Sequence, residues 1–238
     1  MALRFIGIGA PKCATTWTFD LLKHHPDVQF PAGKEVNFWS DPKARGGFEW
    51  YRDVMQDGDL GVVAGEISVE YGRLPAEKIR EMRRRYPDVR LFLHVRHPID
   101  RAWSMARMRI REAQLDVADM TEGELMKYIF VPGNIENGDY ASTMDRWLAV
   151  FPAEQMLISR YDDIDGDAAG SLARVCTHIG VDFTPLAGRR HGLTIGRRYA
   201  DDRPIPSGIR SVLERLYAEP MARFLDEYGI DYTGPGEA

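Results

Sequence analysis

Residues 3–17 read L-R-F-I-G-I-G-A-P-K-C-A-T-T-W, a short apolar run followed by small residues, a lysine and two threonines. The apolar run from Leu3 to Ile8 predicts a strand. Apolar residues recur at helical spacing from Thr15 to His24, and Pro26 marks the end of that pattern. This part of the chain therefore predicts a strand, a turn and a buried helix, in that order.

The turn over residues 9–17 has the composition of an anion site. Backbone N–H groups at the start of a helix carry partial positive charge and bind phosphate or sulfate. Lys12 would add a full charge, and Thr15 and Thr16 would add hydroxyl donors. An ordinary turn with a threonine cap has a similar sequence, so a second motif is needed to distinguish the two.

Spacing separates this turn from two other phosphate-binding loops. A nucleoside triphosphatase pattern starting at Gly9 needs glycine and lysine where Ala14 and Thr15 stand. A cysteine phosphatase pattern starting at Cys13 needs an arginine where Phe19 stands. We therefore interpret Cys13 as a small loop residue and not as a nucleophile.

A second strand, turn and helix occur at residues 89–104, V-R-L-F-L-H-V-R-H-P-I-D-R-A-W-S. The strand is predicted from Val89 to Val95, and Pro98 suits the first turn of the following helix. Arg96 at the strand end and Ser104, about two turns into the helix, could bind one phosphate through a guanidinium fork and a hydroxyl. Arg96 pairing with a nearby acid would explain this segment alone equally well.

Further strands and helices alternate along the chain, which predicts an α/β fold with a central, mainly parallel sheet flanked by helices on both faces. In such sheets ligands bind at the carboxyl ends of the strands. No repeat or long linker occurs, so we expect a single domain over residues 1–238. The other expected strands run from Val62 to Ala64 and from Gln155 to Arg160, and the other expected helices run from Pro75 to Tyr86, Tyr140 to Val150, Ala168 to Ile179 and Ser207 to Tyr228, the last with a break near Pro220.

Together the two turns resemble the family of sulfotransferases that use 3′-phosphoadenosine-5′-phosphosulfate (PAPS), in particular its bacterial and glycan-type members. K-C-A-T-T-W after the first strand resembles the family's 5′-phosphosulfate loop, and R-H-P-I-D-R-A-W-S resembles its 3′-phosphate motif. Residues 138–164 and 216–229 resemble later segments of the family. The resemblance implies a P-loop-like fold and sulfuryl transfer from PAPS, with 3′-phosphoadenosine-5′-phosphate (PAP) as the product.

The resemblance also implies the residues that contact the cofactor. Lys12 would contact the 5′-phosphate and the bridging oxygen, Trp17 would lie beside the adenine, and Arg96 and Ser104 would bind the 3′-phosphate. Arg101 matches the arginine within that second motif, although a salt bridge with Asp100 or Glu112 would explain it equally well. The full implied set is Lys12, Cys13, Ala14, Thr15, Thr16, Trp17, Arg96, Ser104, and Arg197 and Arg198 in the basic stretch 189–198, where an exposed basic loop is the alternative.

Sulfuryl transfer needs in-line attack, a base for the acceptor proton and positive charge near the leaving oxygen. Lys12 can supply the charge. The segment K-E-V-N-F-W (34–39) resembles the part of heparan-type sulfotransferases in which a glutamate is the base, so we predict Glu35 as the base; a surface pair of Lys34 and Glu35 is the alternative. Glu66 and the histidines His94 and His97 are the other candidates, the histidines by resemblance to the sulfotransferases of phenols and steroids.

The acceptor is expected to be a hydroxyl, less readily an amine, of a small molecule, a carbohydrate or a lipid. G-E-I-S-V-E-Y (65–71) resembles a glycan-type E-K-S-P-A-Y segment, but Ile67 replaces its lysine, which weakens the prediction of a glycosaminoglycan acceptor. The acceptor's identity and the oligomeric state are left open by the sequence.

Composition limits the remaining classes. The formal net charge of −5 argues against a surface that follows nucleic acid. Two distant cysteines predict no disulfide, and the six histidines lack metal-binding spacing, so no metal is expected. No apolar run approaches the roughly 20 residues of a membrane span, and the start does not resemble a secretion signal, so we expect a cytoplasmic protein.

Two other functions remain possible from the residues alone. One is a nucleoside triphosphate kinase built on the same strand, loop and helix, because a fold does not fix a function. The other is a nucleotide-binding regulatory module that binds phosphates without turnover.

Overall fold

The computed structural model describes residues 3–41, 43, 46–56, 62–187 and 203–232. The chain divides into two compact units, residues 1–95 with 146–196 and residues 96–145 with 197–238. Each unit has its own buried apolar cluster. The single domain expected over residues 1–238 stays a prediction.

The first unit is built on a five-stranded sheet with the order β2-β3-β1-β4-β5. All neighbouring strands run parallel, which confirms the predicted sheet. The strands are β1 (Phe5–Gly9), β2 (Val28–Gln29), β3 (Val63–Ile67), β4 (Arg90–Val95) and β5 (Met156–Arg160). β3 continues three residues beyond the predicted Ala64.

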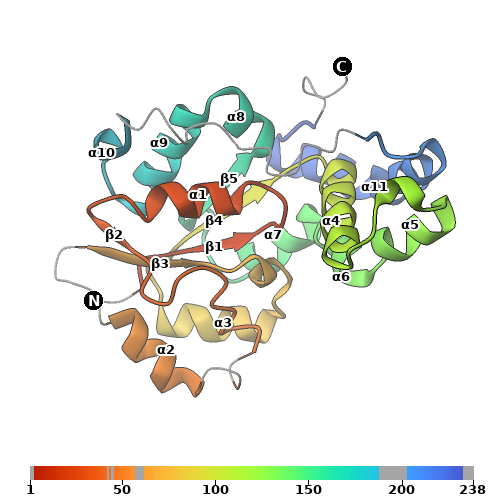
Figure 1. Cartoon of the computed structure of the whole chain (residues 1–238). Coiled ribbons are helices and arrows are strands. Elements are labelled where there is room, and N and C mark those ends of the chain that lie inside the picture. Colours follow the sequence, from red (N-terminus) through yellow and green to blue (C-terminus); the bar gives the residue numbers. More distant parts are fainter. Residues whose placement is uncertain (1–2, 42, 44–45, 57–61, 188–202, 233–238) are drawn as a thin grey trace. The chain divides into compact units, whose positions relative to one another are not determined.

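Helices cover both faces of this sheet, as the alternation of strands and helices predicts (Figure 1). On one face lie α1 (Thr15–Leu22) and α9 (Ala168–Ile179), accompanied by the short helices α8 (Tyr161–Gly166) and α10 (Thr184–Ala187). On the other lie α2 (Gly47–Gln56) and α3 (Ala76–Arg85). The short 3₁₀ helix η2 (Val69–Arg73) follows β3, and the 3₁₀ helix η4 (Ala153–Gln155) directly precedes β5.

Glycines in the central strands make room for aromatic rings. A Cβ on Gly65 would lie 2.2 Å from the ring of Phe5, and a Cβ on Gly7 would lie 2.5 Å from the ring of Phe92. The two rings stack with their centroids 6.3 Å apart. The close approach of ring to backbone explains why these strands carry glycine despite its low strand propensity.

The second unit is helical. It contains α4 (Pro98–Glu112), η3 (Val117–Asp119), α5 (Glu122–Ile129), α6 (Pro132–Glu136), the first part of α7 (Tyr140–Leu148) and α11 (Ser207–Tyr228). Its core joins α4, α5 and α11 through Ile99, Trp103, Ile110, Leu125 and Ile209, together with neighbouring apolar residues. α5 starts at a capping box in which Thr121 and Glu124 each bind the other's backbone N–H.

The predicted break near Pro220 is wrong, because α11 continues through this residue. Proline removes the N–H that would bind the carbonyl four residues earlier, here that of Leu216. Leu216 lies on the exposed side of the helix, where 43% of the residue is accessible. Water can therefore satisfy that carbonyl without the helix ending.

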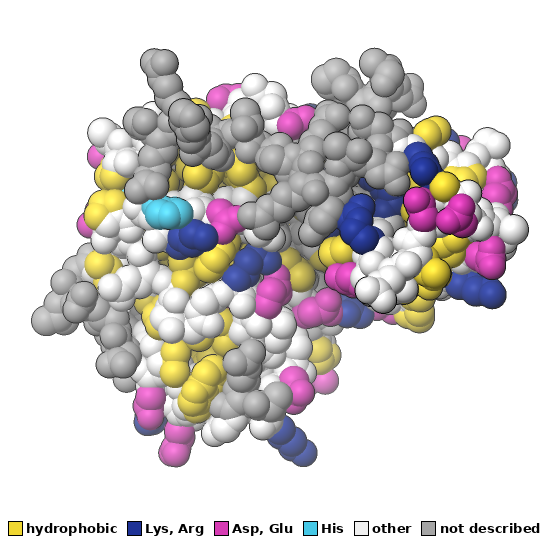
Figure 2. All heavy atoms as spheres, viewed as in Figure 1, with side chains coloured by type: hydrophobic (Ala, Val, Ile, Leu, Met, Phe, Trp, Pro, Cys, Tyr) yellow, Lys and Arg dark blue, Asp and Glu magenta, His cyan; other side chains and the backbone are white. Residues whose placement is uncertain are grey.

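Charged side chains of both signs are interspersed over the described residues of the face in Figure 2. This matches the near balance of 31 basic and 36 acidic residues in the sequence. No helix in the described part of the chain is both long and apolar enough to cross a membrane.

Candidate active site

The predicted phosphate loop joins β1 to α1. Gly9, Lys12 and Ala14 have φ angles of 145°, 70° and 68°. The N–H of Ala10 donates to the carbonyl of His94 in β4 at 2.8 Å, which attaches the loop to the neighbouring strand. Ala14 is the N-cap of α1 and offers no side-chain hydrogen bond to the first turn. The start of α1 thus lacks a side-chain cap, which suits it to an anionic ligand.

The side chains of the loop differ in exposure. Thr16 is exposed and Lys12 is partly buried, whereas Thr15 is buried. Cys13 is fully buried, with its Sγ 3.7 Å from the carbonyl oxygen of Pro11. These positions fit the interpretation of Cys13 as an interior loop residue, and they leave Thr16 exposed and Lys12 partly exposed.

Trp17 packs into the apolar cluster of the first unit, together with Phe5, Leu21 and Cys176. It is 9% exposed. Most of the indole therefore serves the core. The adenine contact implied by the resemblance stays a prediction and involves at most the exposed part of the ring.

His94, in β4, contacts α1 through its side chain. Its Nε2 lies 2.8 Å from the Thr18 hydroxyl oxygen, and the residue has no exposed surface. Burial lowers the pKa of His94 to about 4, so the imidazole is neutral near pH 7. A side chain so enclosed cannot reach an acceptor, and its role here is structural.

Glu35 lies at the carboxyl end of β3. Its N–H donates to the carbonyl of Ile67 at 2.9 Å, and its Oε2 accepts from the N–H of Val69 at 3.0 Å. Its other carboxylate oxygen pairs with Lys34. The Glu35 side chain is 35% exposed. The pair with Lys34 is thus observed, and Glu35 is also fixed against the strand end, whereas its role as the base stays a prediction.

Glu35 and the phosphate loop occupy neighbouring strand ends. β1 and β3 are paired, with Gly7 opposite Ile67. The carbonyl oxygen of Val69 lies 3.2 Å from the place that a Cβ on Gly9 would occupy. Val69, which binds the Glu35 carboxylate, therefore abuts the first residue of the loop that carries Lys12.

Glu66 is completely buried in β3. Its Oε1 accepts from the Tyr51 hydroxyl at 2.5 Å, and its Oε2 accepts from the hydroxyls of Ser68 and Tyr71 at 3.3 Å each. Burial raises the pKa of Glu66 to about 7. Having no exposed surface, Glu66 cannot take a proton from an acceptor. The signal in the sequence was an acid within the otherwise uncharged strand V-A-G-E-I.

The predicted 3′-phosphate residues belong to the second unit. Arg96 directly follows β4, and its N–H and carbonyl are both bound by the Tyr140 hydroxyl, at 3.2 and 2.9 Å. Arg96 and Ser104 are partly exposed. His97 precedes α4, and its ring lies 6.0 Å from that of Tyr232. Tyr140 was missed because nothing near it in the sequence points to Arg96.

Arg101, the other arginine of the second motif, is fully buried. Its guanidinium donates to the carbonyl of Asn134 and, at 3.0 Å, to the Asn134 side-chain oxygen. The Asn134 amide donates to the carbonyls of Ala102 and Ile129 at 3.1 and 2.9 Å. Arg101 therefore joins α4 to α6 inside the second unit and is not available to a nucleotide. The predicted contacts Arg197 and Arg198 lie outside the described residues.

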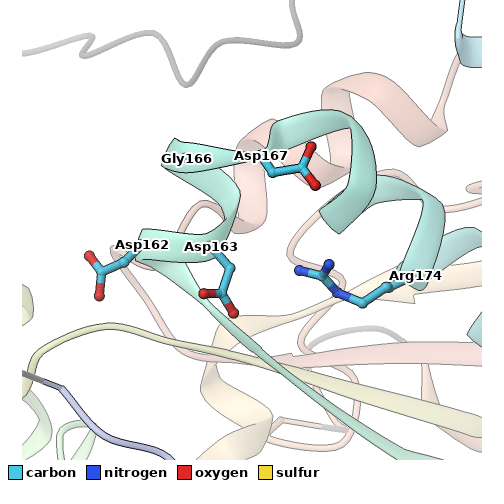
Figure 3. Close-up of a pocket in the computed structure, with 5 residues that line it drawn as sticks. All are labelled: Asp162, Asp163, Gly166, Asp167 and Arg174. Atoms are coloured by element: carbon cyan, nitrogen blue, oxygen red, sulfur yellow. The ribbon is translucent and has the colours of Figure 1, made fainter. Parts of the chain in front are cut away.

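A hollow of about 470 Å³ lies beside α8 and the start of α9. Figure 3 shows the side chains of Asp163 and Arg174, two of the residues that line it, pointing toward one another. Asp167 accepts from the N–H of Gly170 at 2.9 Å and caps α9. The lining of the hollow contains three aspartates and one arginine, so its net negative charge would repel phosphate. Across the described residues, no group of three or more His, Cys, Asp or Glu side chains is arranged to hold a metal ion.

Comparison with known proteins identifies related chains. Human heparan sulfate glucosamine 3-O-sulfotransferase 3B1 is 30% identical over 183 residues, which cover 73% of this chain and 45% of the relative. Carbohydrate sulfotransferase 15 from Rattus norvegicus is 23% identical over 257 residues, covering 79% of this chain and 45% of the relative. The chain thus spans less than half the length of these two relatives.

Solved structures share the fold. A sulfotransferase from Alicyclobacillus acidocaldarius superposes with a TM-score of 0.73 at 22% identity, covering 97% of each chain. The mouse sulfotransferase SULT7A1, complexed with PAP, gives a TM-score of 0.61 at 16% identity, covering 95% of this chain and 88% of the other. The model of the sulfotransferase domain matches residues 4–192, well over half of the sequence. The chain therefore belongs to the sulfotransferase domain family.

Proposed function

We propose that this chain transfers the sulfuryl group of PAPS to a hydroxyl of a carbohydrate, small-molecule or lipid acceptor. The observation that carries the proposal is the placement of Glu35 at the end of β3, fixed to Val69, which abuts Gly9 at the start of the Lys12 loop. The predicted base and the predicted anion-binding loop thus lie beside the ends of two adjacent strands. Membership of the family and the shared fold support the same function.

PAPS would supply the activated sulfuryl group. Lys12 and the N-terminal amides of α1 would hold its 5′-phosphate side, and Arg96 and Ser104 would hold the 3′-phosphate. Glu35 would take the acceptor proton as the acceptor oxygen forms its bond to sulfur. Lys12 would stabilise the negative charge left on the bridging oxygen when its bond to sulfur breaks and PAP is released.

The acceptor is proposed to carry a free hydroxyl within reach of Glu35. The names of the relatives favour a carbohydrate. Ile67 provides no positive charge at the end of β3, beside the backbone that binds Glu35. A carbohydrate with few negative charges therefore fits this edge better than a highly sulfated glycosaminoglycan.

The first test is calorimetric binding of PAP, with ATP and magnesium measured in parallel. We expect tight binding of PAP that is lost in Arg96→Ala, and weak binding of ATP. Preference for ATP would overturn the proposal in favour of a kinase.

Turnover tests the role of Glu35. Sulfated product is expected with PAPS and an acceptor panel, and Glu35→Gln should lower turnover about 10²-fold because the base is lost. Glu70→Gln is the matched control, since Glu70 is similarly exposed and pairs with Arg73. PAP binding without any sulfated product across the panel would instead support a regulatory module, and equal turnover of the two variants would remove Glu35 as the base.

A further inference from the structure

The segment that carries Glu35 is held by hydrogen bonds from the backbone N–H of every second residue. The acceptors lie at the end of β3 and in the residues that follow it. The N–H of Glu35 donates to the carbonyl of Ile67, and the N–H of Asn37 donates to the Ser68 hydroxyl at 3.1 Å. Glu35 and Asn37 have φ angles of 57° and 55°. Such left-handed conformations are unfavourable for residues with a Cβ, so external bonds are needed to maintain them.

The next alternate residue is held in the same way. The N–H of Trp39 donates to the Tyr71 hydroxyl at 3.2 Å. The hydroxyls of Ser68 and Tyr71, which receive these amides, both donate their own protons to Oε2 of Glu66. One buried carboxyl oxygen thus accepts the last hydrogen bond of two chains of hydrogen bonds, here called relays. One relay runs from Asn37 through Ser68, and the other runs from Trp39 through Tyr71.

We propose that Glu66 is a positioning residue, which fixes the base Glu35 by holding the backbone of residues 37–39 through Ser68 and Tyr71. The inference rests on the proposed function, because it assigns to Glu66 the support of the same reaction. It extends that function by naming a group that contacts neither PAPS nor the acceptor.

A carboxyl group suits this position because of the donors around it. A hydroxyl that donates to a carboxylate is polarised and becomes a better acceptor for a backbone N–H. Tyr51 on α2 donates to Oε1, which leaves Oε2 for Ser68 and Tyr71. No arrangement of an aliphatic side chain could accept these three protons.

The surroundings of Glu66 are aromatic and acidic. Tyr51 and Tyr86 face it from α2 and from the end of α3, Tyr71 faces it from η2, and Glu35 acts on it as a like charge. Burial and this like charge both raise the pKa of the group, whereas the hydrogen bonds from the hydroxyls of Tyr51, Tyr71 and Ser68 lower it. Removing the Ser68 or the Tyr71 hydroxyl should loosen the backbone whose N–H that hydroxyl accepts.

Two tyrosine variants separate positioning from burial. Tyr71→Phe removes the relay to Trp39, whereas Tyr51→Phe removes a donor to the same carboxyl group but leaves both relays intact. We expect Tyr71→Phe to lower kcat about 10-fold or more with the KM for PAPS within about 3-fold, because the base is displaced while the phosphate loop is not. Tyr51→Phe should lower kcat clearly less, by about 3-fold at most.

Amide hydrogen exchange gives a readout that does not depend on activity. The Trp39 N–H should exchange faster in Tyr71→Phe than in Tyr51→Phe, and the Asn37 N–H should exchange faster in Ser68→Ala than in Ser68→Thr, which keeps the hydroxyl. Equal kcat in the two tyrosine variants, or unchanged exchange at Trp39 in Tyr71→Phe, would overturn the positioning role. Failure of the proposed function would show instead as wild-type protein that does not bind PAP or that forms no sulfated product with any acceptor.

Discussion

Glu66 and His94 lie on β3 and β4, the strands on either side of β1, and both have no exposed surface. Burial favours the neutral form of each, so it moves their pKa values in opposite directions, to about 7 for Glu66 and about 4 for His94. Their effects on stability have opposite signs. Below the unfolded value of 4.5 the Glu66 contribution is fully present, and it is lost as pH rises toward 7. The His94 contribution is present above 6.5 and is lost as pH falls toward 4.

Between pH 4.5 and 6.5 the free energy of unfolding of the wild-type protein should change little, because the pH dependences of the Glu66 and His94 contributions nearly cancel. Glu66→Gln removes one of them, so we expect the free energy of unfolding of this variant to fall more steeply with acid than that of the wild type. The difference between the two curves should change by about 3 kcal/mol between pH 4.5 and 7, the size of the Glu66 shift. Urea denaturation at several pH values measures it. Parallel curves for the two proteins would show that Glu66 does not titrate in this range.

The secondary-structure elements show which features a sequence can reveal. The strand, loop and helix at residues 5–22 were predicted because apolar periodicity and the following small residues are local signals. β2 and α6 were missed because they have two and five residues and depend on contacts with distant segments. The continuity of α11 at Pro220 was missed because it depends on the exposure of Leu216, which no local pattern records.

Gly65 gives a prediction at the scale of the sheet. A methyl group there would overlap the Phe5 ring in the core, so Gly65→Ala should lower the free energy of unfolding by about 1–3 kcal/mol. Gly123 in α5 has nothing within 4 Å of its Cβ position, so Gly123→Ala should be neutral or stabilising by up to about 1 kcal/mol. Denaturant midpoints of both variants provide the measurement. A neutral Gly65→Ala would mean that Phe5 can move aside.

At the scale of the whole molecule, the predicted fold class is confirmed, and two predicted site segments, at Lys12 and Glu35, are shown to lie on neighbouring strand ends. The Glu66 relays could not be predicted, because they join residues 37–39, 51 and 66–71 through side-chain geometry. The internal place of Arg101 was equally hidden, since a motif gives the spacing of a residue and not its burial.

The division into two units leads to a prediction for unfolding. Its boundary at residue 145 falls inside α7, and Arg96 follows β4 with no intervening linker. Independent domains are usually joined by exposed linkers. We therefore expect one cooperative transition, with tryptophan fluorescence and far-ultraviolet circular dichroism coinciding. Two separated transitions would instead show that the units unfold independently.

The enclosure of both cysteines has a practical consequence. Cys13 lies inside the loop and Cys176 inside the core cluster, and burial raises the pKa of Cys176 to about 11. Alkylating reagents need an accessible thiolate, so they should leave both residues unmodified in the folded protein. A cysteine introduced at the exposed Leu115 could then carry a single fluorophore, without first removing the native thiols.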